Sequence, residues 1–67
     1  SDSLEALKAK MKEYISNGVR LGWLIDPIEK QVSIYRANGE VEVLVDPETV
    51  SGEDVLPGFE LHPRELW

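Results

Sequence analysis

The sequence predicts an α+β fold: one N-terminal amphipathic helix, then a mainly antiparallel three-stranded sheet with a β-hairpin at residues 31–45, then an irregular C-terminal tail. Three observations predict this fold. Apolar residues recur at helical spacing over residues 4–15, a short apolar run follows at residues 21–25, and two stretches of alternating apolar and polar residues flank Asn38-Gly39. We expect residues 1–67 to form a single small domain.

Five apolar residues of the predicted helix lie within about 100° of arc at 3.6 residues per turn: Leu4, Leu7, Met11, Tyr14 and Ile15. Asp2 or Ser3 can cap the first amides. Glu5 follows Asp2 by three residues, which is the spacing of a capping box and suits the positive end of the helix dipole. Gly18 supplies the left-handed residue that ends the helix.

The apolar run after the helix is too short for a second helix and is bounded by Gly18 and Asp26-Pro27; it holds Leu21, Trp23, Leu24 and Ile25. Nearly continuous apolar character is typical of a strand that is buried on both faces in the middle of a sheet. We therefore expect a largely buried strand here, and a central position for it.

The predicted hairpin has Asn38-Gly39 at its turn, because both residues tolerate positive φ. Apolar residues alternate with polar ones on both sides of this turn, at the period of two that half-buried strands show: Val32, Ile34, Val41, Val43 and Val45. From residue 46 onward turn residues dominate, a short helical turn is expected at Pro63, and Leu61, Leu66 and Trp67 form a last apolar edge.

A single helix covers only one face of a three-stranded sheet, so we expect the other face to be uncovered. If the Trp23 strand is central, one sheet edge also lacks a partner, which favours association. We therefore expect either a homodimer or a parent protein whose preceding residues supply the missing strands.

Composition limits the classes of function that fit. The chain has no cysteine and one histidine, His62, so a disulfide framework and a zinc site are both disfavoured. The net charge of −6 is uneven, with +1 over residues 1–36 and −7 over residues 37–67, so the chain alone should bind DNA poorly. No apolar run reaches the roughly 20 residues of a membrane span, so we expect no membrane association and a cytoplasmic location.

Four stretches, in order and spacing, carry a resemblance to a known family: LEALKAKMKEYISNGVRLGWLIDP at residues 4–27, SIYRANGEVEVL at 33–44, LPGF at 56–59 and RELW at 64–67. Together they resemble the second half of the Uma2 family of restriction endonucleases, a branch of the PD-(D/E)XK superfamily. The resemblance implies that an Asp and a Glu on preceding strands bind a divalent metal, usually Mg²⁺. It also implies that this sequence begins, at Ser1, near the loop that joins those strands to the helix.

The same resemblance identifies Lys10, four residues before Tyr14, as the lysine that completes the catalytic site. Counted from the Leu7 direction, Lys10 projects about 60° to one side of the apolar stripe and could reach a cleft beside the sheet. The alternative interpretation is a boundary lysine whose stem covers apolar surface. Lys8 and Lys12 are interpreted as solvated partners of Glu5 or Glu13.

The remaining candidates are interpreted without chemistry. Five acidic residues lack the alternating spacing of a calcium loop and are interpreted as a solubilising face: Glu40, Glu42, Glu48, Glu53 and Asp54. His62 precedes Pro63, where a capping or loop role is more common than catalysis. Trp23 and Trp67 are expected to pack in the core and the tail, because base stacking needs a basic surround.

Taken with the resemblance, these patterns predict the C-terminal half of a larger restriction-endonuclease-like domain. The chain would then be part of a metal-dependent DNA endonuclease, structural and inactive alone because the Asp and Glu ligands are absent. We expect no cofactor in this chain, Mg²⁺ in a complete family member, and DNA binding only in the complete protein. The alternative is a free-standing acidic interaction module that self-associates through an exposed strand edge.

Overall fold

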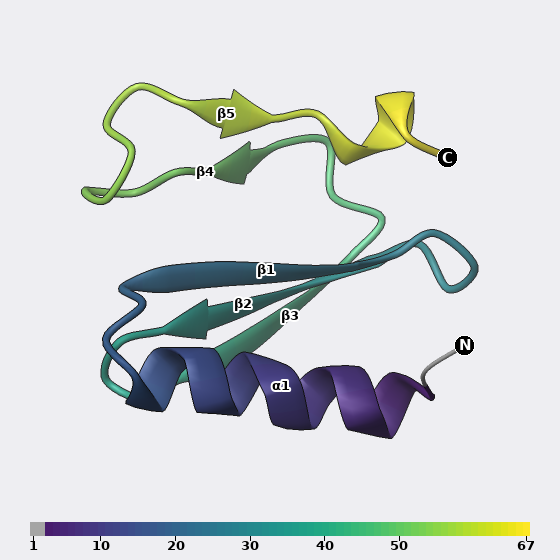
Figure 1. Cartoon of the computed structure of the whole chain (residues 1–67). Coiled ribbons are helices and arrows are strands. Elements are labelled where there is room, and N and C mark those ends of the chain that lie inside the picture. Colours follow the sequence, from purple (N-terminus) through teal and green to yellow (C-terminus); the bar gives the residue numbers. More distant parts are fainter. Residues whose placement is uncertain (1–2) are drawn as a thin grey trace.

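The computed structural model describes residues 3–67 and places one helix and two small sheets in three layers (Figure 1). The elements are α1 (Leu4–Ser16), β1 (Leu21–Asp26), β2 (Gln31–Arg36), β3 (Val41–Val45), β4 (Val50–Ser51), β5 (Glu60–Leu61) and a 3-10 turn, Pro63–Glu65. Helix α1 lies on one face of the β1–β3 sheet, and the β4–β5 pair lies on the other. The predicted α+β class and element order are confirmed.

Helix α1 begins and ends at the residues that its sequence predicts. Ser3 is the N-cap, and its Oγ accepts a hydrogen bond from the amide of Ala6 at 3.2 Å. The other predicted cap, Asp2, lies outside the described residues, and so does the capping box that rested on it. At the C-terminal end Gly18 adopts φ 100°, which is the left-handed conformation that glycine adopts without strain.

The packed face of α1 is rotated relative to the predicted stripe and includes only part of it. Met11 and Ile15 face the sheet, together with the stem of Lys8, whereas Leu7 and Tyr14 are 36% and 50% exposed. A Cβ added to Gly22 in β1 would lie 2.6 Å from Cε of Met11, so the helix sits directly on the glycine. Part of the predicted apolar stripe therefore remains uncovered.

The β1–β3 sheet is an antiparallel meander in which β2 is central. The prediction of a central Trp23 strand is wrong for residues 3–67, because tight turns on both sides of β2 leave β1 at an edge. Every residue of β1 is only partly buried, whereas Val32, Ser33, Ile34 and Tyr35 in β2 are buried.

The predicted 31–45 hairpin is confirmed, with its turn at Asn38-Gly39. Gly39 has φ 90° and donates its amide hydrogen bond to the carbonyl of Arg36 at 2.9 Å. The three valines of β3, however, are 42%, 52% and 70% exposed, for Val41, Val43 and Val45 respectively. Their face of the sheet is the helix face, but α1 packs mainly on β1 and β2, and a groove lies between α1 and β3.

The C-terminal segment, residues 46–67, covers the sheet face that was expected to be uncovered. The prediction of an uncovered face is therefore wrong. The segment is also more regular than an irregular tail, because β4 and β5 pair antiparallel with Val50 opposite Leu61. Val50 is 1% exposed and joins Val32 and Ile34 in the core. Around these three pack Leu21, Trp23, Ile25, Leu44, Leu61 and Trp67. The main core therefore lies between the sheet and the C-terminal segment.

Within residues 3–67, α1 is too short and too polar to cross a bilayer, and the 3-10 turn is shorter still.

Candidate functional site

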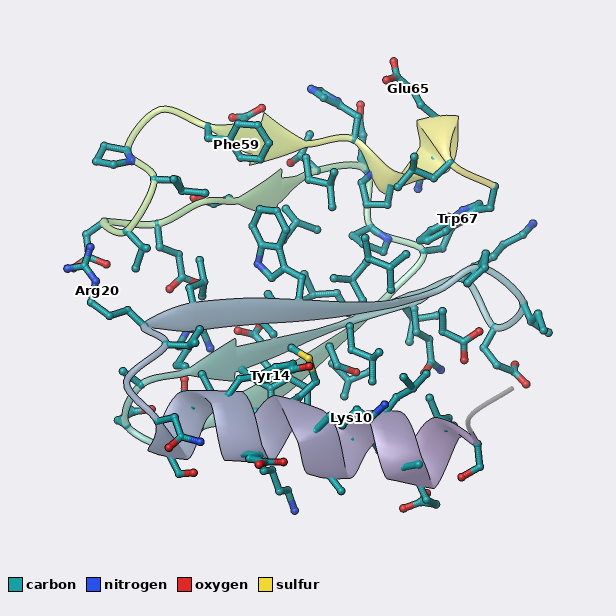
Figure 2. The ribbon with its side chains drawn as sticks, in the orientation of Figure 1. Lys10, Tyr14, Arg20, Phe59, Glu65 and Trp67 are labelled. Carbon is teal, nitrogen blue, oxygen red and sulfur yellow. The ribbon has the colours of Figure 1, made fainter. Side chains whose placement is uncertain are left out.

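Lys10, the one residue predicted to be catalytic, lies on the exposed side of α1 (Figure 2). It does not line the groove between α1 and β3, which is formed instead on the side of Lys8 and Lys12. At about 100° per residue, Lys10 projects about 160° away from Lys12 around the helix. The groove therefore lies on one side of α1, and Lys10 lies on the other side with Leu7 and Tyr14.

That other side of α1 is the side of the β1 edge. Since α1 rests on Gly22 and its Lys12 side faces β3, its Leu7, Lys10 and Tyr14 side projects past β1. Figure 2 shows Lys10 and Tyr14 labelled on α1 below β1. Among residues 3–67 no strand lies beyond β1 on the Lys10 side, so the predicted cleft would need a further strand there. The catalytic role of Lys10 stays a prediction.

The β1 edge is also apolar on its opposite face. Trp23 stacks on Phe59, with ring centroids 5.9 Å apart and an angle of 19° between the planes. Phe59 and Leu56 are 47% and 49% exposed, and Leu56 lines a hollow with Leu21 and Trp23. Uncovered apolar side chains thus flank β1 both on the helix face and on the face of the C-terminal segment. These side chains form an apolar border along β1, of the kind that favours a contact surface.

Arg36 is the centre of a cluster with three glutamates. Its Nη1 lies 2.7 Å from Oε1 of Glu40, and its Nη2 lies 2.9 Å from Glu42 and 2.6 Å from Glu53. The Arg36 Nε also donates to both carboxylate oxygens of Glu53 at 3.1 Å. One guanidinium therefore joins the end of β2, the hairpin turn, β3 and the C-terminal segment.

The sequence pattern does not single out Arg36, and it predicts only a solubilising face for its three acidic partners. Nothing in the local pattern pairs Arg36 with Glu53, which is 17 residues away. The i,i+4 spacing of Arg36 and Glu40 across the hairpin turn is the one signal that could have shown part of the cluster. Because a guanidinium occupies these carboxylates, the cluster does not fit a divalent metal.

The ion pair with Arg36 lowers the pKa of Glu53, chiefly through the side-chain hydrogen bonds. The ionised form of Glu53 is therefore favoured in the folded chain. The stability that it contributes is present above the ordinary pKa of a glutamate and is lost as the pH falls through the lowered value. Glu53 also adopts φ 57°, which is strained for a side-chain-bearing residue, so the ion pair helps to hold a costly backbone conformation.

Glu53→Gln is accordingly expected to lower the urea midpoint at pH 7, and this difference should shrink as the pH falls through the lowered pKa of the wild-type carboxyl. The measurement is a set of urea titrations between about pH 7 and pH 3. Glu48→Gln, which changes an exposed carboxylate elsewhere in the acidic half, is the matched control. A midpoint difference that stays constant across this pH range would contradict the assignment.

The other residues that the sequence singled out occupy structural positions. His62 precedes the 3-10 turn and makes no side-chain cap hydrogen bond. Trp23 and Trp67 pack against the core as predicted, and the indole nitrogens of both are buried without an acceptor within residues 3–67. No group of three or more Asp, Glu or His side chains in this part of the chain is arranged to hold a metal ion.

Comparison with known proteins gives one family. The family model Uma2, described as "Putative restriction endonuclease", matches residues 1–64 of the 67. A search of curated proteins gave no match.

Proposed function

The chain belongs to the Uma2 family of restriction-endonuclease-like proteins, and from this membership we propose that it is part of a metal-dependent DNA endonuclease. In this proposal residues 1–67 are the C-terminal half of a larger domain. They supply α1, which carries Lys10, and the outer strands of the catalytic sheet. The chain alone has a structural role.

The observation that carries the proposal is the open edge of β1. Along an antiparallel pair, residues alternate between those that bond the neighbouring strand and those that do not. The hydrogen bond from the Arg36 amide to the Glu40 carbonyl at 2.9 Å fixes this alternation for β2. It follows from the register that the amides and carbonyls of Leu21, Trp23 and Ile25 point away from β2, toward the open edge.

A further strand at this edge would satisfy those groups and cover the apolar border. Its side chains would contact Leu7 and Tyr14 on the helix face, and Trp23 and Phe59 on the other face. A strand that precedes α1 in the chain and joins β1 through this helix would run parallel to β1, in the right-handed sense that such connections follow. Lys10 projects on the side where that strand would lie.

The chemistry explains what the added strand contributes. Hydrolysis of a phosphodiester is assisted by a divalent metal that activates water and neutralises charge on the phosphate, and Mg²⁺ is the metal expected for the family. In our proposal the carboxylates that hold it stand on the strands that precede α1. A lysine ammonium beside them stabilises negative charge that develops on the scissile phosphate. Lys10 is the residue assigned to this role.

The test compares two polypeptides: residues 1–67, and the same chain extended by the residues encoded before Ser1. With plasmid DNA and Mg²⁺ we expect no cleavage by the first and cleavage by the second. Hydrogen exchange gives a second readout, since the amides of Leu21, Trp23 and Ile25 should exchange rapidly in the short chain and slowly in the extended one. Cleavage by residues 1–67 alone, or unchanged exchange in the extended protein, would overturn the proposal.

The alternative proposal is a free-standing acidic module that self-associates through the β1 edge. Two copies related by a twofold axis at Trp23 would place Arg20 of one opposite Asp26 of the other, so the charges at this edge are complementary. Light scattering that gives a dimer, together with an extended chain that lacks nuclease activity, would favour this alternative. Under either proposal we place the protein in the cytoplasm.

A further inference from the structure

The second edge of the sheet, β3, presents a row of hydrogen-bonding groups that β2 does not use. The amide of Arg36 donates to Glu40 at 2.9 Å, and the amide of Asp46 donates to Lys30 at 2.6 Å. These bonds fix the alternation along β3, so Glu42 and Leu44 bond to β2. The amides and carbonyls of Val41, Val43 and Val45 therefore point away from the sheet.

This edge lacks most of the features that usually block pairing, and its one charged residue, Glu42, forms an ion pair with Arg36. Its five residues contain no proline, lysine or glycine, and the register with β2 runs through them without a bulge. The same three valines whose backbone groups are open have side chains that are 42–70% exposed. Branched side chains of this kind favour a strand partner.

We propose that β3 pairs antiparallel with β3 of a second copy of this chain, about a twofold axis at Val43. Val43 then faces Val43 of the second copy, and Val41 faces Val45 of the second copy. All the residues that face each other in this way have open backbone groups. The three pairs form about six hydrogen bonds, two for each, and join two three-stranded sheets into one continuous sheet.

Charge selects this register over its neighbours. Centred on Val43, the pairing sets Glu42 opposite Leu44 of the second copy. A shift that centres the axis on Glu42 brings two glutamates face to face, and one that centres it on Leu44 sets Glu42 opposite Asp46; each leaves only about four hydrogen bonds. At the ends of the favoured register Glu40 faces Asp46, but these carboxylates are already held by Arg36 and Arg64.

The surface involved is one short strand and its valines, so the association is expected to be weak and dependent on concentration. It does not depend on the proposed nuclease function. That proposal concerns the β1 edge, whereas this one concerns the opposite edge, which a strand added at β1 leaves open. The two proposals can therefore fail separately.

Disulfide cross-linking of single-cysteine variants tests the register directly, because the chain has no cysteine of its own. Facing residues with paired hydrogen bonds have Cα atoms about 5.5 Å apart, which is within disulfide range. Under mild oxidation Val43→Cys should form a covalent dimer. Val41→Cys alone should not, because its counterpart lies four residues along, about 13 Å away. A mixture of Val41→Cys and Val45→Cys should give the mixed dimer.

Ile28→Cys, at an 89% exposed position in the β1–β2 turn, is the control for random collision. Sedimentation of Val43→Lys should show association weakened by more than about tenfold, because two lysines would meet at the axis. Its circular dichroism should match that of Ile28→Lys, which shows that both fold. Equal cross-linking at positions 28 and 43 would indicate random collision, and dimers that persist in Val43→Lys would point to the β1 edge. Either result would overturn the proposal.

Discussion

Replacing Ile34 with alanine is expected to lower the free energy of unfolding by about 2–5 kcal/mol, because the loss of buried methyl groups leaves a cavity. Ile34 is 3% exposed at the centre of β2, between Trp23 and Glu42 in register, and packs in the core with Val32 and Val50. A chain of 67 residues has a total stability of roughly 3–10 kcal/mol. The variant should therefore lose a large part of its stability, and its urea midpoint should fall accordingly.

The chain provides a matched control in Ile28→Ala. Ile28 is 89% exposed in the turn between β1 and β2, so the same chemical change should cost less than about 0.5 kcal/mol there. Urea titrations followed by tryptophan fluorescence measure both variants. Equal midpoints for the two would contradict the placement of the core between the sheet and the C-terminal segment.

The parts of the fold that the sequence predicts are those fixed by contacts close in the chain. Ser3 and Gly18 bound α1 through bonds within a single turn, and Asn38-Gly39 closes the hairpin by the same kind of local chemistry. These signals do not depend on what lies across the molecule. The element order and the antiparallel sheet could therefore be predicted before the structure.

The errors concern which surfaces meet, which depends on distant residues. The apolar character of residues 21–25 predicted a central strand, but it reflects packing by Phe59 and Leu56 on one face and by α1 on the other. The two-residue strands β4 and β5 are too short to show a period of two. For that reason the sequence pattern did not predict that β4 and β5 cover the second face of the sheet.

For the candidate site, too, local periodicity predicts some features and packing between distant residues determines the others. The position of Lys10 on α1 follows from helical periodicity, and its side of the helix follows from which neighbours pack. The pattern could not show that Lys8 and Lys12, rather than Lys10, border the groove toward β3, because the helix is rotated relative to its apolar stripe. The rotation comes from the close approach of Met11 to Gly22.

This rotation makes Lys10 and Lys12 a discriminating pair for the proposed nuclease. Both are exposed lysines on one helix, two residues apart, with equal charge and similar helix propensity. Only Lys10 projects on the side of the open β1 edge, where we place the metal-binding strand. A general loss of positive charge would affect DNA binding similarly at either position, whereas loss of a group at the scissile phosphate would affect cleavage at one.

In the extended protein Lys10→Ala is expected to lower the rate of plasmid cleavage by about 100-fold or more, the usual effect of removing a group that stabilises charge in the transition state. Lys12→Ala should retain cleavage within a few fold, because its ammonium lies about 160° around α1. Fluorescence anisotropy with DNA in the absence of metal should give similar affinities for the two variants, which separates catalysis from binding. Equal loss of cleavage in both variants would assign α1 to general phosphate attraction and remove Lys10 from the catalytic site.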